Sequence, residues 1–190
     1  MDIPTIIRLY EGVIGGVIAM QRLSDIEKAY EVRDPWGFQS NPEDEKRKRR
    51  ILEIATQYRP IMLFYDRALD IGAGEGWITK DLPARKKYGY EVSTHAKKRF
   101  PSDVMDYEGG EKGHGGNQFD LITACGVLYS HYDYRHFIRM INTHASNVII
   151  TCNIKDWEIN LKANPIEATQ VHMEEFTYRE YVQTLRVFKK

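Results

Sequence analysis

Three closely spaced glycines carry the most specific chemical signal in the sequence. The segment Ala68–Trp77 joins an apolar run to glycines at positions 72, 74 and 76. A strand that runs into such a turn offers its backbone N–H groups to a ligand, because glycine has no Cβ to block the approach. The third glycine comes one residue earlier than the dinucleotide pattern G-x-G-x-x-G requires, which disfavours NAD. The alternative to a ligand-binding turn is a turn with a purely structural role.

Carboxylates flank this glycine turn. Asp70 ends the predicted strand and is suited to accept a hydrogen bond from an ammonium group or from the turn's own N–H groups. Glu91 lies nineteen residues beyond Gly72, near the roughly 20-residue spacing at which an acid holds ribose hydroxyls. A polar cluster at 102–106 falls where the next strand is expected to end. One of its acids could accept a hydrogen bond from an adenine amino group.

A loop rich in proton-handling side chains follows the third predicted strand. It covers Tyr129–His136 and lies at the expected cleft. His131 is the candidate general base, with Tyr129 and Asp133 as substrate contacts. A hydroxyl acceptor gains from a general base, whereas an amine needs only to be neutral when it attacks. For His131 the alternative is an ordinary polar histidine of a loop.

Short apolar runs from residue 67 onward predict the elements that position these groups. The runs lack strict alternation, which is typical of strands buried on both faces of a parallel sheet. Helical patterns between them indicate an open, doubly wound α/β sheet. A glycine-rich stretch stands where one crossover helix would be expected, so shortened crossovers are predicted. The strands are predicted at 67–71, 88–92, 119–124 and 148–151, the helices at 77–84, 96–100 and 134–143, and the glycine-rich stretch is 108–117.

Segments outside this alternation complete the predicted fold. Aromatic and β-branched runs at 171–176 and 181–188 predict a closing antiparallel pair at the sheet edge. Acids followed by apolar residues over 41–55 predict a helix, because acids in a first turn interact favourably with the helix dipole. Apolar residues at helical spacing over 3–20 predict an amphipathic helix over a core or a ligand cleft. Charged residues within that segment argue against a membrane span.

Composition limits the classes of function. The 190 residues, 42% of them hydrophobic, predict a single domain. Lys and Arg number 27, as do Asp and Glu, and this balance argues against a nucleic-acid partner held by charge. Cys125 and Cys152 lie far apart in sequence and suggest neither a disulfide framework nor a metal site. A reducing, cytoplasmic setting is therefore expected.

These motifs together resemble a class I S-adenosylmethionine-dependent methyltransferase. Residues 68–76 match the first motif of that family, 88–93 the second and 119–129 the fourth. The resemblance implies a Rossmann-like, mostly parallel seven-stranded sheet that binds S-adenosyl-L-methionine and releases S-adenosyl-L-homocysteine. It places Asp70 near the methionine moiety, Glu91 on the ribose hydroxyls and Asp103 with Val104 on adenine. Further cofactor contacts carried over by the resemblance are Gly72, Ala73, Gly74, Gly76, Val92, Thr123 and Cys125.

A narrower resemblance comes from the front of the chain. The segment Asp34–Pro42 and the helix after it are similar to the opening of the NodS-like methyltransferases, which include the nodulation-factor N-methyltransferase. The resemblance implies one methyltransferase domain over 1–190, with a helical cap over residues 1–60 and a core over 67–190. Arg47 or Lys48 would then reach the carboxylate of the donor, unless the basic run is only a solvated helix face. Trp36 is either a core residue or an apolar wall of the site.

Several functions are compatible with these motifs. The first is methylation of a small-molecule acceptor, either a sugar, a nucleotide sugar or an amine-bearing metabolite. The second is a non-catalytic S-adenosylmethionine-binding subunit that needs a partner, because the acid expected before Val127 is replaced by Gly126. RNA and protein methyltransferases are disfavoured, since no basic appendage is present. A homo-oligomer or a partner subunit is compatible with the short chain, and no membrane association is expected.

Overall fold

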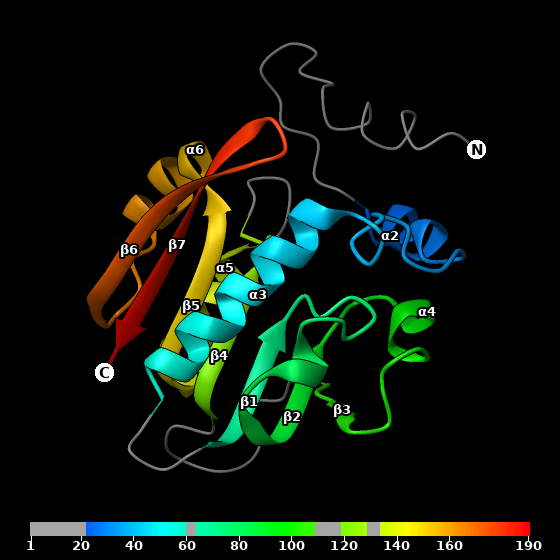
Figure 1. Ribbon diagram of the computed structural model, residues 1–190, viewed down its shortest axis with the longest axis horizontal. Coiled ribbons are helices and arrows are strands. Elements are labelled where there is room, and N and C mark those ends of the chain that lie inside the picture. The colour runs from blue at the N-terminus through cyan, green and yellow to red at the C-terminus, as the bar shows by residue number, and fades with distance from the viewer. Residues whose placement is uncertain (1–21, 60–63, 109–118, 129–133) are drawn as a thin grey trace.

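The computed structural model describes residues 22–59, 64–108, 119–128 and 134–190. They build a mixed sheet covered by helices on both faces (Figure 1). The helices and helical turns are α2 (Leu23–Ala29), α3 (Pro42–Gln57), the 3₁₀ turn η2 (Thr79–Asp81), α4 (Thr94–Lys97), α5 (Tyr134–His144), α6 (Ile154–Asp156) and the π-helical turn η3 (Trp157–Leu161). The strands are β1 (Tyr65–Ile71), β2 (Ala84–Tyr90), β3 (Val104–Asp106), β4 (Phe119–Cys125), β5 (Ala145–Asn153), β6 (Thr169–Tyr178) and β7 (Tyr181–Lys189).

The sheet has seven strands in the order β3-β2-β1-β4-β5-β7-β6. The strands β1 to β5 are parallel, and β7 runs antiparallel to both β5 and β6. The strand order reverses direction between β1 and β4. Ligands of open α/β sheets bind at such a point, beyond the carboxyl ends of the strands. The predicted mostly parallel sheet with an antiparallel C-terminal edge is confirmed.

Helix α3 covers one face of the sheet, where it crosses the strands diagonally (Figure 1). Asn41 caps it by accepting a hydrogen bond from the Glu43 N–H at 2.9 Å, and Pro42 occupies its first turn. Ile51 and Ile54, both fully buried, pack with Ala68 of β1 and residues of β4, β5 and β7. Helix α5 and the η3 turn cover the opposite face. The helix predicted over 41–55 is therefore confirmed.

Two predictions were wrong around β2, one on the helix before it and one on the bounds of the strand. The helix predicted over 77–84 is reduced to the η2 turn, because Pro83 cannot continue a helix and β2 already begins at Ala84. The strand predicted over 88–92 lies earlier, over 84–90. Its first half is hidden in the sequence by three consecutive basic residues, whose side chains are partly or fully exposed. The short β3 pairs with only the last of them, Lys87. The glycine-rich stretch 108–117, on which the prediction of shortened crossovers rests, lies outside the described residues from 109 onward. Glu91 follows β2 directly.

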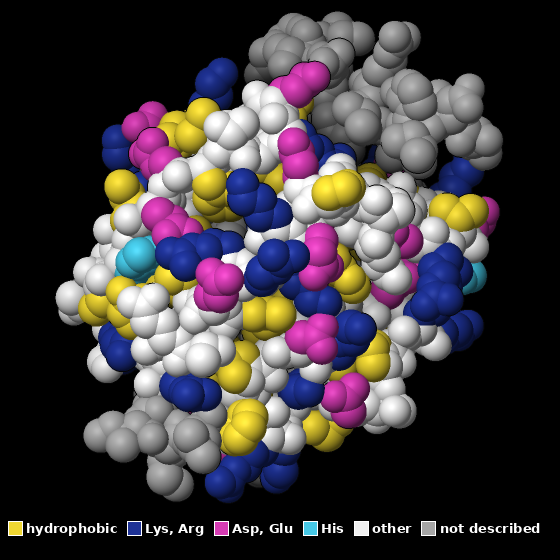
Figure 2. Space-filling view, viewed as in Figure 1, with side chains coloured by type: hydrophobic (Ala, Val, Ile, Leu, Met, Phe, Trp, Pro, Cys, Tyr) yellow, Lys and Arg dark blue, Asp and Glu magenta, His cyan; other side chains and the backbone are white. Residues whose placement is uncertain are grey.

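The charges on the surface are mixed. Figure 2 shows acidic and basic side chains interspersed on the face that carries α3. No helix within the described ranges combines the length and the apolar character needed to cross a membrane.

The helix predicted over 3–20 lies outside the described residues.

Candidate functional site

The glycine turn follows β1 at the point where the strand order reverses. Gly72, Gly74 and Gly76 have φ values of 70°, 56° and 76°, in the left-handed region that favours glycine. The N–H groups of Gly72 and Ala73 both donate to the carbonyl of Tyr90, at 2.8 and 3.1 Å. A Cβ at Gly72 would lie 2.1 Å from Cγ1 of Val127, so a side chain does not fit there. The turn is fixed against the end of β2 and against the segment that follows β4.

Asp70 forms the buried base of this turn. Its side chain accepts hydrogen bonds from the hydroxyls of Thr79, at 2.7 Å, and Thr123, at 2.6 Å. Burial raises its pKa to about 6, because the two hydroxyls compensate only part of the lost hydration. The sequence predicted an acceptor for an ammonium group or for the N–H groups of the turn. The structure instead pairs Asp70 with threonines of η2 and β4.

Glu91 connects the glycine turn to the end of β2. One carboxylate oxygen accepts from the Gly74 N–H at 2.8 Å. The other accepts from the N–H groups of Val92 and Ser93, at 2.8 and 3.0 Å. Burial raises the pKa of Glu91, while these three N–H groups act in the opposite direction. Because a carboxylate offers about four lone-pair positions, one acceptor position is left for a further donor.

A pocket opens between the glycine turn and the N-terminal segment. Asp70 and the turn residues 72–75 line the pocket. Aromatic side chains line it as well, and among them the indole N–H of Trp36 donates to the hydroxyl of Tyr30 at 3.2 Å. Cys125 also lines the pocket, and burial raises the pKa of its thiol to about 12, so the thiol stays protonated. The aromatic lining consists of Tyr30, Trp36, Phe38 and Trp77.

The basic run of α3 contributes one residue to this pocket. Arg47 lines it, is 6% exposed and pairs with Asp44 at 3.1 Å. Lys48 points elsewhere. Its ammonium group pairs with Asp81 at 2.6 Å and lies 4.6 Å from the centre of the Trp77 ring. Of the two cations considered for the donor carboxylate, the structure places Arg47 at the pocket.

The predicted adenine contacts do not reach the carboxyl edge of the sheet. Asp103 precedes β3, is exposed, and pairs with Lys87 at 3.0 Å, which lowers the pKa of Asp103. Val104 is the first residue of β3 and is buried. Since β3 is parallel to β2, its carboxyl end is Asp106, opposite Gly89. Within the cluster 102–106, Asp103 therefore lies before β3 and Asp106 lies at its carboxyl end.

Most other predicted site residues lie around the glycine turn. Trp36, Ala73 and Gly74 line the pocket. The Gly76 N–H donates to the carbonyl of Ala73, and the Thr123 hydroxyl donates to Asp70. Val92 follows Glu91 and is exposed. The predicted catalytic residues Tyr129, His131 and Asp133 lie outside the described residues. No group of His, Cys, Asp and Glu among the described residues is arranged to hold a metal ion.

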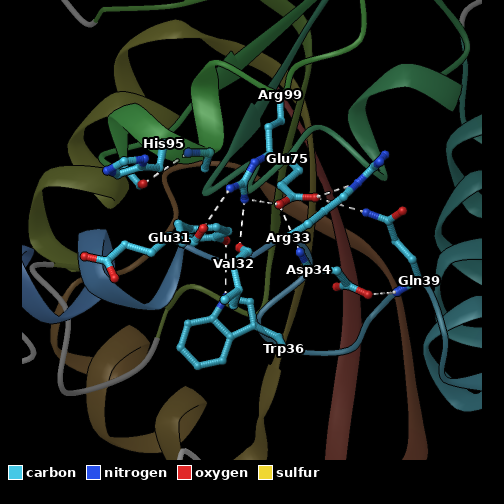
Figure 3. A network of polar contacts seen from close by, with 12 residues as sticks. Glu31, Val32, Arg33, Asp34, Trp36, Gln39, Glu75, His95 and Arg99 are labelled. Carbon is cyan, nitrogen blue, oxygen red and sulfur yellow. Dashed lines mark hydrogen bonds and ion pairs between the residues drawn. The ribbon is translucent and has the colours of Figure 1, made fainter. Parts of the chain in front are cut away.

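Glu75, inside the glycine turn, joins the N-terminal segment to the site, and sequence reasoning missed it. Its carboxylate accepts from the Asp34 N–H at 2.9 Å and pairs with Arg99 at 2.8 Å. The Arg99 guanidinium also donates to the carbonyls of Glu31 and Val32, as Figure 3 shows. The signal in the sequence was the charge itself, because Glu75 stands between Gly74 and Gly76 in the turn. Its partners are far away in sequence.

Solved structures resemble this chain in fold. The N-methyltransferase NodS from Bradyrhizobium japonicum WM9, in complex with S-adenosyl-L-homocysteine, has 18% identity and a TM-score of 0.70, over 88% of this chain and 97% of NodS. A 1,6-didemethyltoxoflavin-N1-methyltransferase from Burkholderia thailandensis has 16% identity and a TM-score of 0.60, over 88% and 86%. A ribosomal protein L11 methylase from Lactobacillus delbrueckii has 13% identity and a TM-score of 0.55, over 76% and 79%.

These similarities concern the fold. No protein-family model matches the chain, and no curated protein matches its sequence. The solved structures share less than a fifth of their residues with it. They show that the chain has the Rossmann-like fold of these methyltransferases, as the sequence predicted.

Proposed function

We propose that this chain is an S-adenosylmethionine-dependent methyltransferase that acts on a small molecule. The observation that carries the proposal is the hydrogen bond from the Gly74 N–H to Glu91. It fixes a carboxylate beside a glycine turn at the carboxyl ends of β1 and β2, an arrangement suited to ribose hydroxyls. The donor is further supported by the NodS and toxoflavin enzymes, which were solved with S-adenosyl-L-homocysteine.

The residues of the pocket fit the two ends of such a donor. Glu91 has an acceptor position left for a ribose hydroxyl, because three N–H groups occupy the others. Arg47 suits the carboxylate of the methionine end, since its buried Nε has no hydrogen-bond partner in the described part of the chain. Trp36 would form an apolar wall. For the adenine amino group we assign Asp106, at the carboxyl end of β3, in place of Asp103.

Methyl transfer requires mainly that the protein position the donor and the acceptor. S-adenosylmethionine supplies a methyl group on a positively charged sulfur, which provides the driving force for transfer. The chain would hold donor and acceptor in line and exclude water, for which the aromatic residues Tyr30, Trp36 and Phe38 are suited. His131 stays our candidate general base, with Tyr129 and Asp133 as acceptor contacts, because in the sequence these residues come shortly after β4, which ends at Cys125.

The described elements outside the sheet suit a small acceptor. Beside the strands, we assign the acceptor contacts to the N-terminal segment and to the connection between β5 and β6, which carries α6 and η3. We infer a sugar, a nucleotide sugar or an amine-bearing metabolite as the acceptor. The balanced charge of the chain supports an acceptor that is not a nucleic acid.

Calorimetry with S-adenosylmethionine and S-adenosyl-L-homocysteine tests the donor. We expect both to bind, and Gly74→Val to abolish binding while circular dichroism stays native. The valine would need a φ of 56°, and its Cβ would lie 2.9 Å from the Tyr30 hydroxyl. Lys98→Ala, which changes an exposed residue, is the control and should bind both ligands as the wild type does. Absence of wild-type binding at high micromolar ligand would refute the proposal.

A donor-dependent methylation screen over sugars, nucleotide sugars and amines, followed by mass spectrometry, tests the activity. We expect a mass gain of one methyl group on one of these classes. The His131→Ala variant should lower turnover while donor binding stays unchanged. Tight donor binding with no product from any class would instead indicate the non-catalytic, partner-dependent subunit.

A further inference from the structure

A buried group of charges joins α3 to the turn between β6 and β7. We call Asp44, Arg47, Tyr178 and Arg179 the α3–hairpin cluster. Asp44 has no exposed surface. It accepts a hydrogen bond from the Tyr178 hydroxyl at 2.5 Å and pairs with Arg47 at 3.1 Å and Arg179 at 2.9 Å. These residues come from opposite ends of the chain, and the contacts bring them to the edge of the pocket that Arg47 lines.

The cluster carries more positive than negative charge. One carboxylate, that of Asp44, faces the two guanidinium groups of Arg47 and Arg179. The Arg47 guanidinium lies 4.5 Å from the centre of the Tyr178 ring and 5.3 Å from that of Phe38, so it is held by ring faces rather than by a second anion. Its Nε has no hydrogen-bond partner within the described residues. A buried cation with an unused donor at a pocket suits an anionic group of a ligand.

Arg179 is the residue that holds the hairpin turn against the site. It has a φ of 52°, unusual for a residue with a side chain, and its N–H donates to the Glu43 carboxylate at 2.7 Å. Its guanidinium also donates to the carbonyl of Trp36 at 3.3 Å. One residue of the turn thus contacts the first turn of α3, the Asp44 carboxylate and the segment that carries the pocket's tryptophan.

Packing of α3 on the sheet does not require these charges. The apolar residues Ile51, Ile54 and Ala55 are fully buried and already bind α3 to the sheet. A buried ion group adds little to stability when compared with well-packed apolar side chains. The position of the α3–hairpin cluster, at the pocket end of the helix, indicates a role in placing Arg47.

We propose that Asp44 and Arg179 are positioning residues that hold the Arg47 guanidinium in the pocket for a carboxylate ligand, the carboxylate at the amino-acid end of the methyl donor. This inference rests on the proposed function. It makes the C-terminal hairpin a part of the donor site, although Tyr178 and Arg179 lie more than a hundred positions after the glycine turn. Asp44 fixes the orientation of Arg47, and Arg179 fixes Asp44 and leaves Arg47 free to bind the ligand.

The test compares two ligands by calorimetry. S-adenosyl-L-homocysteine has the amino-acid end, whereas 5′-methylthioadenosine keeps the adenosine and the thioether and lacks that end. We expect Arg47→Ala and Arg179→Ala each to lower the affinity for S-adenosyl-L-homocysteine by about tenfold or more. This is the loss typical of a hydrogen bond to a charged group. Binding of 5′-methylthioadenosine should change by less than about twofold in both variants. The double variant should lose no more affinity than Arg47→Ala alone.

Controls separate positioning from folding. Arg49→Ala removes an exposed cation of the same helix and should bind both ligands as the wild type does. Tyr178→Phe removes one hydroxyl from Asp44 and keeps the ring under Arg47, so it is the milder variant if Arg179→Ala does not fold. If Arg179→Ala lowered the affinity for both ligands equally, or for neither, the positioning role would be overturned. A wild type that binds neither ligand would refute the proposed function itself.

Discussion

Two polar networks fasten the N-terminal part of the chain to the sheet, and they differ in burial. In the α3–hairpin cluster the central acid, Asp44, is fully buried and its partners are buried or partly buried side chains. In the network around Glu75 the acid has a side chain that is 6% exposed, but Arg33 and Arg99 are 79% and 28% exposed. Glu75 and Arg99 also contact main-chain groups (Figure 3). The first network fixes a charge, and the second fixes the path of a segment.

The comparison shows how one type of contact serves two purposes. A buried ion pair is costly to break, because removal of one partner leaves an uncompensated charge away from water. An exposed pair is replaced by water at little cost. The Glu75 network keeps its segment in place mainly through hydrogen bonds that the Glu75 and Arg99 side chains make with backbone atoms of the segment. We therefore expect the two networks to respond differently to loss of a charge.

The largest effect is expected from Asp44→Ala. The change leaves two guanidinium groups and a tyrosine hydroxyl without their common acceptor. Unfolding free energy should fall by about 3–5 kcal/mol, as measured by urea denaturation. Glu45→Ala, an exposed acid in the same turn of α3, is the control and should cost less than about 1 kcal/mol. Similar losses in the two variants would show that burial does not distinguish the cluster.

A second effect concerns Asp70, which is buried and held by hydroxyls rather than by a direct cation. Its folded pKa, about 6, lies above the ordinary 3.8, so the folded state binds the proton more tightly. Stability should therefore fall as pH rises from about 4 to about 6, by roughly 3 kcal/mol in total. Asp70→Asn, whose amide can bond to both threonines, should remove this slope.

Urea denaturation of both proteins over this pH range measures the difference. Because other acids titrate in both proteins, the difference between the two curves is the quantity that matters. Parallel curves would contradict the assignment of the slope to Asp70.

The smallest effect is expected in the Glu75 network. Arg99→Ala removes the guanidinium that joins Glu75 to the carbonyls of Glu31 and Val32. We expect a global loss of about 1 kcal/mol together with faster hydrogen exchange at the Asp34 amide, because the segment opens locally. Arg33→Ala is the matched control. Its pair with Glu75 is 4.0 Å long and exposed, so exchange should stay unchanged. Equal exchange rates in the two variants would contradict this difference.

Local patterns were sufficient where neighbouring residues decide the structure. The glycine turn, the position of Glu91 after β2, the helix α3 with its acidic first turn and the C-terminal antiparallel pair were all predicted from the sequence. Each depends on backbone freedom, on period or on side-chain type within a few residues. Predictions were wrong where a neighbour in space decides. The basic residues at the start of β2 form a strand because β1 pairs with them.

The same distinction applies to the site. The sequence by itself determined that a glycine turn and a following acid stand at the end of parallel strands, because chain geometry requires it. Tertiary structure alone decided that Arg47 rather than Lys48 lines the pocket, and that Asp106 rather than Asp103 lies at the carboxyl end of β3. Helix rotation and strand direction set which side chain faces the site. Both are fixed by packing against residues far away in the chain, as when the hairpin turn at Arg179 meets Asp44.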